Sequence, residues 1–392
     1  MDGDGEAEVR ALAPTARPRH LFVAAGGGGD VLATLILQRK LCGDGGQPYV
    51  VTYSWDRLMV DPVPGPRDPS WFIGIDRFGD HNYVVSAQSR VRSPGSSLLP
   101  RLARELETKF FLLDPSGAAR GMRLQLAELV RELSIQRVSL VDSGGDILAC
   151  GDEPELRSPM ADCLTLAAAD DIGAPVDVLV TGAGLDGELS HSRVCEIVTE
   201  LGGRASGQFT KDDVKWCMPI LDWHPSEVNG LLIAAAIGYE GTVEIRDAAF
   251  EVHVDQSAAV IHHCHYDAAI THNVLAKAMT VSDDLRDAEG AMLDHQHHSE
   301  IDYQRNKARQ YNRRHHVGSG GYDQRIQTLL RYGMSRRDHV DALSLRRAAE
   351  IMQITSDELE TLGPKLGARC PQSYQPPLWM LNPPADLSIF AR

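Results

Sequence analysis

Three short apolar runs in this chain each end in a loop that combines glycines with acidic residues. A buried strand of a parallel sheet typically has a short and almost continuously apolar sequence. The carboxyl ends of parallel strands lie along one edge of the sheet. Ligands of open α/β sheets bind in the crevice at that edge, so the three loops predict one shared site. The runs occupy residues 21–24, 138–142 and 176–180, and the loops follow at residues 26–30, 143–146 and 182–188.

Strand-like and helix-like patterns alternate along most of the chain. Helical spacing of apolar residues occurs at residues 30–42 and 118–133, and strong strand character at residues 137–142 and 176–181. Strands that alternate with helices of this length are typical of βαβ units. We therefore expect an α/β fold, with a Rossmann-like three-layer α/β/α arrangement and a mostly parallel sheet.

The composition changes at both ends of this alternating region. The start is acidic and then rich in Ala, Pro and Arg, without apolar periodicity, and the end is polar and rich in His and Arg with helical patterns. Segments that lack apolar periodicity do not bury enough surface to order themselves. We expect a disordered lead-in at residues 1–18, an α/β domain with the ligand crevice at residues 19–282, and a helical C-terminal extension at residues 283–392.

The overall charge and the cysteine pattern exclude several classes of function. The formal net charge is −15, whereas nucleic-acid binding rests largely on Lys and Arg that neutralise phosphates. No apolar run approaches the roughly 18 residues that a membrane crossing needs, and the seven cysteines form no C-x₂-C pair. We expect a cytoplasmic protein that contacts neither nucleic acid nor membrane, and a homo-oligomer remains possible.

The first loop places four consecutive glycines, Gly26, Gly27, Gly28 and Gly29, before Asp30 at the start of a helix. Glycine lets the backbone approach a ligand closely, and a helix N-terminus offers unpaired N–H groups to an anion. The spacing matches neither the G-x-G-x-x-G pattern nor the P-loop, so no NAD or FAD fingerprint is present. The loop is interpreted either as a phosphate or carboxylate site or as a tight turn, with Asp30 as a helix cap or a catalytic group.

The second loop brackets two glycines with two aspartates. Asp142 and Asp146 flank Gly144 and Gly145, a spacing that can hold one divalent cation, such as Mg²⁺, Mn²⁺ or Zn²⁺, or one ribose-like diol. Two such carboxylates can also separate their pKa values and act as acid and base. The alternative is a pair of turn-forming aspartates without chemistry.

The third loop carries a similar acidic pair after Gly184. Asp186 and Glu188 are candidates for proton transfer, and with the second loop they would bring four carboxylates to one crevice. The loop resembles the Gly-x-Gly-x-Asp-Gly-His element of sugar-phosphate deaminases and lactonases, although Glu188 stands where that element has its histidine. The resemblance indicates a class of substrate and assigns no catalytic residue.

A histidine cluster at residues 262–265 is the most reactive group outside the loops. On a strand, His263 and His265 share one face, because side chains alternate between the two faces. They are candidates for general acid and base catalysis in the crevice. Together with Asp267 they could instead bind Zn²⁺ or Fe²⁺.

The three loops, together with the helix start at residues 225–228, resemble an uncharacterised family, the domain of unknown function 1152. The quoted matches are residues 22–31, 142–146, 184–189 and 225–228, and the resemblance covers about residues 18–282. It implies a Rossmann-like α/β fold and a site at the glycine loops. It implies no reaction, because the family has no agreed activity.

These patterns favour an enzyme that acts on a small anionic metabolite such as a nucleotide, a nucleoside or a sugar phosphate. The glycine loops would hold the anion, the aspartates of the second loop a cation, and the remaining acids and histidines would move protons. Hydrolysis or group transfer fits these groups better than redox chemistry. The alternative is a protein without catalytic activity that binds a metabolite or a partner.

Overall fold

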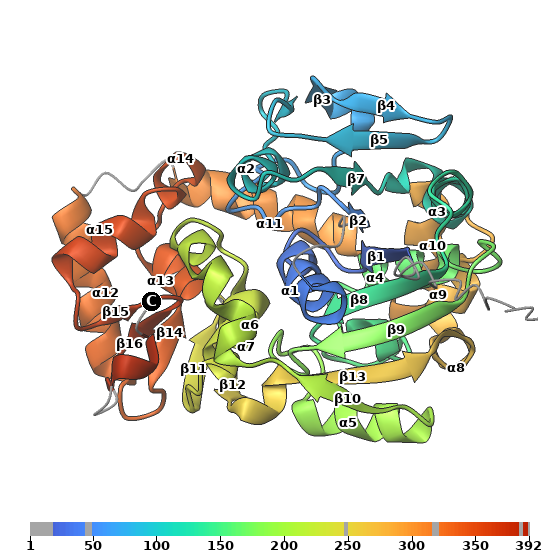
Figure 1. Ribbon diagram of the computed structural model, residues 1–392. Helices are drawn as coiled ribbons and strands as arrows, with labels where there is room; N and C mark the ends of the chain where they lie inside the picture. The colour runs from blue at the N-terminus through green and yellow to red at the C-terminus, as the bar shows by residue number, and fades with distance from the viewer. Residues whose placement is uncertain (1–18, 44–48, 247–249, 316–320, 384–386, 391–392) are drawn as a thin grey trace, which may run out of the picture.

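The computed structural model describes residues 19–43, 49–246, 250–315, 321–383 and 387–390 (Figure 1). The expected disordered lead-in at residues 1–18 lies outside the described residues. Among the helices of the described chain, none has both the length and the apolar character that crossing a bilayer requires.

A nine-stranded sheet forms the centre of the molecule. Its five central strands are all parallel, and two antiparallel strands flank them at each edge. The α/β class and the parallel centre of the sheet are thereby confirmed. The strands in spatial order are β10 (Arg204–Gln208), β13 (Val260–His265), β9 (Val176–Thr181), β8 (Arg137–Ser143), β1 (His20–Ala24), β2 (Tyr49–Thr52), β7 (Phe110–Leu112), β5 (Asn82–Val85) and β4 (Asp76–Phe78).

The strand order reverses direction beside β1. The chain passes from β1 to β2 and β7 on one side, then returns to β8 and β9 on the other. Loops that leave neighbouring strands in opposite directions open a crevice at their carboxyl ends, which is where ligands of open α/β sheets bind. The topology therefore puts the best position for a ligand at the ends of β1 and β8.

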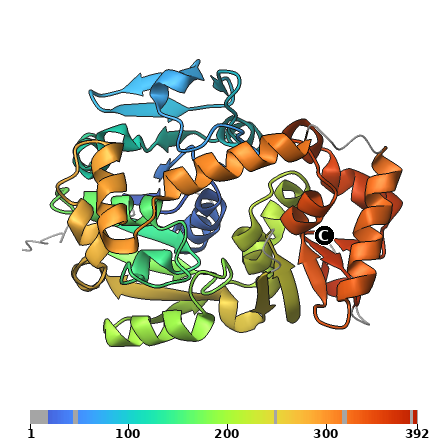
Figure 2. The same cartoon turned by 180° about the vertical axis from the view of Figure 1, so that it is seen from behind.

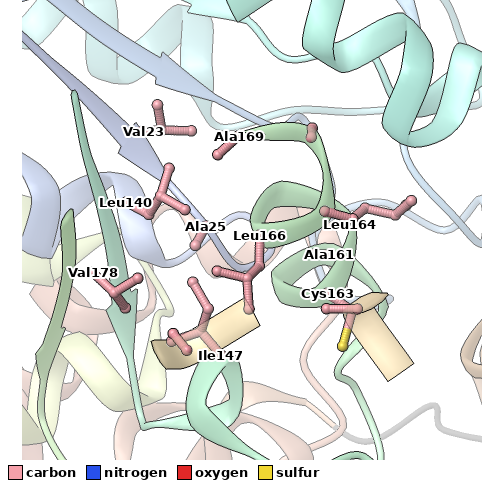
Figure 3. Packing of buried hydrophobic residues seen from close by; sticks show 14 of the residues in the cluster. Val23, Ala25, Leu140, Ile147, Ala161, Cys163, Leu164, Leu166, Ala169 and Val178 are labelled. Carbon is pink, nitrogen blue, oxygen red and sulfur yellow. The ribbon is translucent and has the colours of Figure 1, made fainter. Parts of the chain in front are cut away.

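Helices pack against both faces of the sheet, and β1 shows why. Leu21 and Val23 join one buried apolar cluster, whereas the alternate residues Phe22 and Ala24 join another. Both faces of a strand must be apolar when both are covered. Figure 3 shows the first cluster, in which Val23 and residues of β8 and β9 lie against the helix at residues 160–168.

The helices connect and cover these strands, and several match the expected ranges closely. They are α1 (Asp30–Cys42), α2 (Leu99–Glu105), α3 (Ala118–Glu132), α4 (Met160–Ala168), α5 (His191–Glu200), α6 (Lys211–Val214), α7 (Glu227–Ala236), α8 (Tyr266–His272), α9 (Val274–Met279), α10 (Leu285–Gln296), α11 (Glu300–His315), α12 (Tyr322–Arg336), α13 (Leu345–Ile351), α14 (Ser356–Leu359) and α15 (Leu362–Arg369). A two-stranded sheet of β3 (Phe72–Ile73) and β6 (Arg90–Val91) lies outside the main sheet.

The C-terminal segment is not purely helical, which corrects the expectation for residues 283–392. It contributes three strands to a second sheet with two strands from the middle of the chain, in the order β12 (Phe250–Val254), β11 (Gly241–Ile245), β14 (Ala342–Ser344), β16 (Leu378–Met380) and β15 (Tyr374–Gln375). These strands have only two or three residues each, too few for a visible alternating pattern. Figure 2 shows α11 running from the central part of the molecule to this C-terminal part.

Candidate functional site

A cavity of about 320 Å³ lies at the carboxyl ends of β1 and β8, where the topology places it. This volume falls within the range of small-molecule sites. The loops at residues 26–30, 143–146 and 182–188 all contribute to its lining, and so do Asp142, the start of α11 and parts of the C-terminal segment. The three loops therefore meet at one site, as their positions after parallel strands predict.

Three aspartates form the most compact acidic group of the cavity. One carboxylate oxygen from each of Asp30, Asp142 and Asp162 lies within 4.8 Å of the other two. All three side chains are buried, with residue exposures of 7%, 2% and 4%. Within the described part of the chain, Oδ1 of Asp162 has no hydrogen-bond partner. A buried carboxylate oxygen without a partner is rare, and it is available to a ligand.

Backbone amides hold two of these carboxylates in place. Asp30 begins α1, and its Oδ2 accepts hydrogen bonds from the N–H groups of Gly26 at 2.9 Å and Ser143 at 3.4 Å. Asp142 lies near the end of β8, and its Oδ2 accepts from Gly145 at 2.9 Å and Ile147 at 3.4 Å. In each case these hydrogen bonds engage one carboxylate oxygen and leave the other available to a ligand.

Burial dominates the electrostatics of this group. It raises the pKa of Asp30 to about 7, and it raises the pKa values of Asp142 and Asp162 well above the usual range, with a further contribution from the neighbouring carboxylates. Three carboxylates at such distances cannot all ionise without a compensating charge. A bound divalent cation would supply that charge and restore the ionised forms.

The glycines of the first two loops make room for these carboxylates. A Cβ atom on Gly26 would lie 2.6 Å from Oδ2 of Asp30, and a Cβ on Gly144, where φ is +138°, would clash with Oδ2 of Asp186. A Cβ on Gly184, at φ +79°, would clash with the backbone of His191. Gly26 and Gly144 therefore allow acidic side chains to approach the backbone closely, and Gly184 allows close packing against the start of α5.

The tetraglycine loop offers fewer N–H groups to an anion than its sequence indicates. The N–H of Gly26 donates to Asp30, that of Gly28 to the carbonyl of Trp55 at 2.9 Å, and that of Gly29 to the carbonyl of Gly27 at 2.5 Å. These three donors are thus engaged within the protein. A carboxylate, rather than an external anion, occupies the position next to the start of α1.

Asp146 pairs with the third loop instead of joining Asp142 in the triad. A side-chain hydrogen bond links Asp146 to Asp186, and burial together with the neighbouring carboxylates raises the pKa values of both. Two carboxyl groups hydrogen-bond to each other only when one of them holds a proton. Asp186 also accepts a hydrogen bond from the N–H of Glu188 at 3.0 Å. The N–H of Glu188 therefore orients Asp186, and the raised pKa values favour a proton on one acid of the pair.

Glu188 has a structural environment unlike that of the other acids. Its Oε2 accepts from the N–H groups of Arg157 at 2.6 Å and Ser158 at 2.9 Å, and its Oε1 accepts from the Ser158 hydroxyl at 2.6 Å. Arg246 lies 3.5 Å from Oε1. Burial acts against ionisation, but these hydrogen bonds and the arginine lower the pKa of Glu188 below its usual value. Its place in the site is that of an anchoring carboxylate.

The structure does not bring His263 and His265 to the cavity. Strand β13 runs antiparallel to β9, so that His263 lies opposite Leu179 and His265 opposite Asp177, near the amino end of β9. The cavity is at the carboxyl ends of the parallel strands. His263 instead forms a 2.8 Å contact from Nε2 to Oδ1 of Asp177. The expectation of a shared site fails for these histidines because it assumed a parallel strand.

Several lining residues carry charge that the sequence analysis did not assign. Asp162 stands in the first turn of an otherwise apolar helix, a position that could have drawn attention to it. Glu300 begins α11, and its Oε2 accepts from the N–H of Met160 at 3.0 Å; burial raises its pKa to about 7. Within the described chain, six cationic side chains also line the cavity: Arg57, Arg157, Arg246, Lys307, Arg346 and Arg347. The lining of the cavity therefore combines buried carboxyl groups with cationic groups.

Comparison with known proteins identifies the family and no activity. No curated protein and no solved structure matches this chain. A family model described as a protein of unknown function, DUF1152, matches residues 21–308. The match is well over half of the chain, contains all three acidic loops, and extends beyond residue 282 to include the first residues of α11. This chain belongs to the DUF1152 family, whose function is unknown.

Proposed function

We propose that this protein is an enzyme that uses a divalent metal ion to hydrolyse a small anionic metabolite or to transfer a group from it. One observation carries the proposal: the triad of Asp30, Asp142 and Asp162 is buried in a ligand-sized cavity, and Asp162 has a carboxylate oxygen without a partner among the described residues. An arrangement of this kind is costly to fold unless a cation binds it. The substrate class expected from the sequence, a nucleotide, nucleoside or sugar phosphate, stays a proposal.

The donor set favours Mg²⁺ or Mn²⁺ over Zn²⁺. The triad offers carboxylate oxygens alone, which are the ligands that hard cations prefer, whereas zinc sites in proteins usually include His or Cys. A metal ion held there would polarise a substrate oxygen or lower the pKa of a bound water. Asp30, Asp142 and Asp162 would hold the ion, with the amides of Gly26 and Gly145 fixing two of the carboxylates.

The Asp146–Asp186 pair supplies the proton chemistry in this proposal. One carboxyl group of the pair holds a proton and the other accepts the hydrogen bond, so the pair can donate a proton to a leaving group and accept one from water. Oδ1 of Asp146 is buried and has no partner in the described chain, which leaves it available to a substrate. Hydrolysis and group transfer both need such an exchange.

We also propose a Rossmann-like three-layer arrangement for the central part of the molecule and a cytoplasmic location. The strand order β7-β2-β1-β8-β9 and the apolar clusters on the two faces of β1 support the fold proposal. The location rests on the sequence alone.

Titration calorimetry with Mn²⁺ tests the metal site. The wild-type protein is expected to bind the ion saturably, and Asp162→Asn to weaken binding by about tenfold or more, because a neutral amide replaces an ionised ligand. Asp338→Asn is the matched control, since it makes the same change at a side chain that is 88% exposed. Absence of saturable binding in the wild type, or unchanged binding in Asp162→Asn, would overturn the proposal.

Turnover separates an enzyme from a metabolite-binding protein. Purified protein with Mn²⁺ is incubated with nucleotides, nucleosides and sugar phosphates, and product formation is followed by chromatography. Asp186→Asn is expected to lose turnover and to keep Mn²⁺ binding, because it alters the proton pair and leaves the triad intact. Metabolite binding without turnover in the wild type would instead support the alternative expected from the sequence.

A further inference from the structure

Arg246 has an unusual backbone and a mostly buried side chain at the edge of the cavity. It follows β11, and its φ of +42° lies in the left-handed region that residues other than glycine seldom adopt. Its N–H donates to Oε1 of Glu227 at 3.1 Å, which holds this conformation. The side chain is only 14% exposed. A strained residue whose conformation is fixed by its neighbours occurs most often at functional sites.

The guanidinium group of Arg246 is incompletely partnered. Its Nη1 lies 3.5 Å from Oε1 of Glu188, but its Nε is buried and has no hydrogen-bond partner anywhere in the described chain. Glu188 already accepts three shorter hydrogen bonds and is a weak partner for the arginine. A buried N–H donor without an acceptor is unfavourable, so an anionic ligand is the natural partner for this group.

A second guanidinium group lies beside the same aromatic ring. The Cζ of Arg246 is 5.4 Å from the centroid of the Phe250 ring, and the Cζ of Arg157 is 5.2 Å from that centroid. Both arginines line the cavity. Contact with an aromatic ring restricts a long side chain, and it leaves the N–H groups at the edge of the guanidinium plane available to an acceptor.

The third loop contacts Arg246 and also carries Asp186 of the acidic pair. Gly187 has a φ of +71°, and a Cβ atom there would lie 3.3 Å from Nη2 of Arg246. The next residue, Glu188, contacts Arg246, and the preceding residue, Asp186, belongs to the proton-sharing pair. An anion bound by the arginines would therefore lie next to the groups that move protons.

We infer that Arg246 and Arg157 bind a phosphoryl group of the substrate, at a position distinct from the tetraglycine loop. A planar carboxylate is satisfied by one arginine fork, whereas a phosphoryl group presents three oxygens and up to two negative charges and suits donors that approach from more than one side. The two arginines come from different segments of the chain. This inference rests on the proposed function, because it names the substrate class of the same cavity.

Calorimetric titration with inorganic phosphate, in the presence of Mn²⁺, tests this assignment. The wild-type protein is expected to bind phosphate, and Arg246→Gln to bind it roughly 10- to 100-fold more weakly, as expected for loss of charge-assisted hydrogen bonds. Arg246→Lys is expected to recover only part of the affinity, because an ammonium lacks the fork. Arg193→Gln is the control, because it removes the same charge from an arginine of α5 that pairs with Glu196 and Glu200 and does not line the cavity; it is expected to bind as the wild type does.

Three results would overturn the inference. They are the absence of phosphate binding by the wild type, equal phosphate binding by Arg246→Gln, and acetate that competes with phosphate at equal concentration. Mn²⁺ affinity, measured on the same samples, distinguishes the two proposals: Mn²⁺ binding without phosphate binding contradicts only this inference, whereas loss of both contradicts the proposed function. If Arg246→Gln does not fold, Arg157→Gln is titrated in its place against the same expectation.

Discussion

Buried carboxylates occur in two regions of this molecule with opposite surroundings. In the cavity, Asp30, Asp142 and Asp162 face one another, and burial raises their pKa values. In the second sheet, Glu244 of β11 is fully buried, yet its pKa lies below the usual value. The two regions are joined through β11, which also leads into Arg246.

Cationic and hydroxyl partners account for the difference. Burial acts against ionisation of Glu244, but Tyr332 donates to it at 2.6 Å and Arg347 and Arg336 each donate at 2.7 Å. These hydrogen bonds stabilise the ionised form of Glu244, whose carboxylate thus finds its partners within the protein. The cavity triad has amide donors only, and it has a carboxylate oxygen without a partner among the described residues. A buried acid with all its partners supports the fold, whereas one without them indicates a binding site.

The largest expected effect is the loss of stability when Glu244 loses its charge. Glu244→Gln removes the buried carboxylate that Arg336 and Arg347 share and leaves them their outer acidic partners, Glu251 and Glu350. Breaking a buried ion pair on one side typically destabilises a protein by about 3–5 kcal/mol. Urea denaturation followed by circular dichroism measures the change. A loss of less than about 1 kcal/mol, within the usual range of a surface ion pair, would show that the Glu244 group is not structural.

A smaller effect concerns pH and a carboxyl group at the rim of the triad. Burial and the neighbouring Asp61 raise the pKa of Asp56 to about 7, above its unfolded value near 4. The folded state then binds more protons than the unfolded state between these values, so stability is present at low pH and falls as the pH rises through this window. The metal-free wild type should lose on the order of 2 kcal/mol between pH 5 and 7 relative to Asp56→Asn.

Denaturation curves of both proteins at several pH values give this difference directly. Equal slopes of unfolding free energy against pH would mean that Asp56 is ionised in the folded protein, and the contrast between the two regions would then not extend to the rim of the cavity.

The smallest expected effect is a gain of stability in the triad. Asp162→Asn removes one of three mutually repelling groups, so the metal-free protein should become more stable by about 1 kcal/mol, as is common where function requires an unfavourable site. The melting temperature without metal measures the stability of the metal-free protein, and the increase with Mn²⁺ measures the stabilisation by the ion. The wild type should gain stability from Mn²⁺ and the variant should gain less. If metal-free Asp162→Asn were less stable than the metal-free wild type, Asp162 would support the fold as Glu244 does, which contradicts the expected difference between the two regions.

The sequence predicted the position of the site because that position follows from local patterns. Apolar runs that end in glycine and acid mark the carboxyl ends of strands, and the strand at Arg137–Ser143 and the helix at Asp30–Cys42 lie where the patterns place them. Three loops after parallel strands must share an edge of the sheet. Asp142 and Asp186 were found for this reason.

The identity of the remaining groups depends on packing that no local pattern records. The histidines of β13 carry the same strand signal in either direction, and only the antiparallel pairing with β9 directs the chain from His263 to His265 toward the amino end of β9, away from the cavity. Asp162 enters the cavity because of the way α4 packs on the sheet. Arg246 does so because β11 pairs with the adjacent β12 and with β14, which lies about a hundred residues later in the sequence. The pairing of Asp146 with Asp186 rather than Asp142 likewise depends on backbone geometry at two positive-φ glycines.

Pairing of β11 with β14 also sets the order in which the site is completed during synthesis. Val243 and Glu244 pair with Ala342 and Leu343, which leave the ribosome about a hundred residues later. Chains begin to fold from the N-terminus as they emerge, so the acidic loops can assemble before the strand that carries Arg246 into the cavity is fixed in its sheet. A nascent chain would thus bring the acidic loops together first, and the lining of the cavity would be completed only after β14 has emerged.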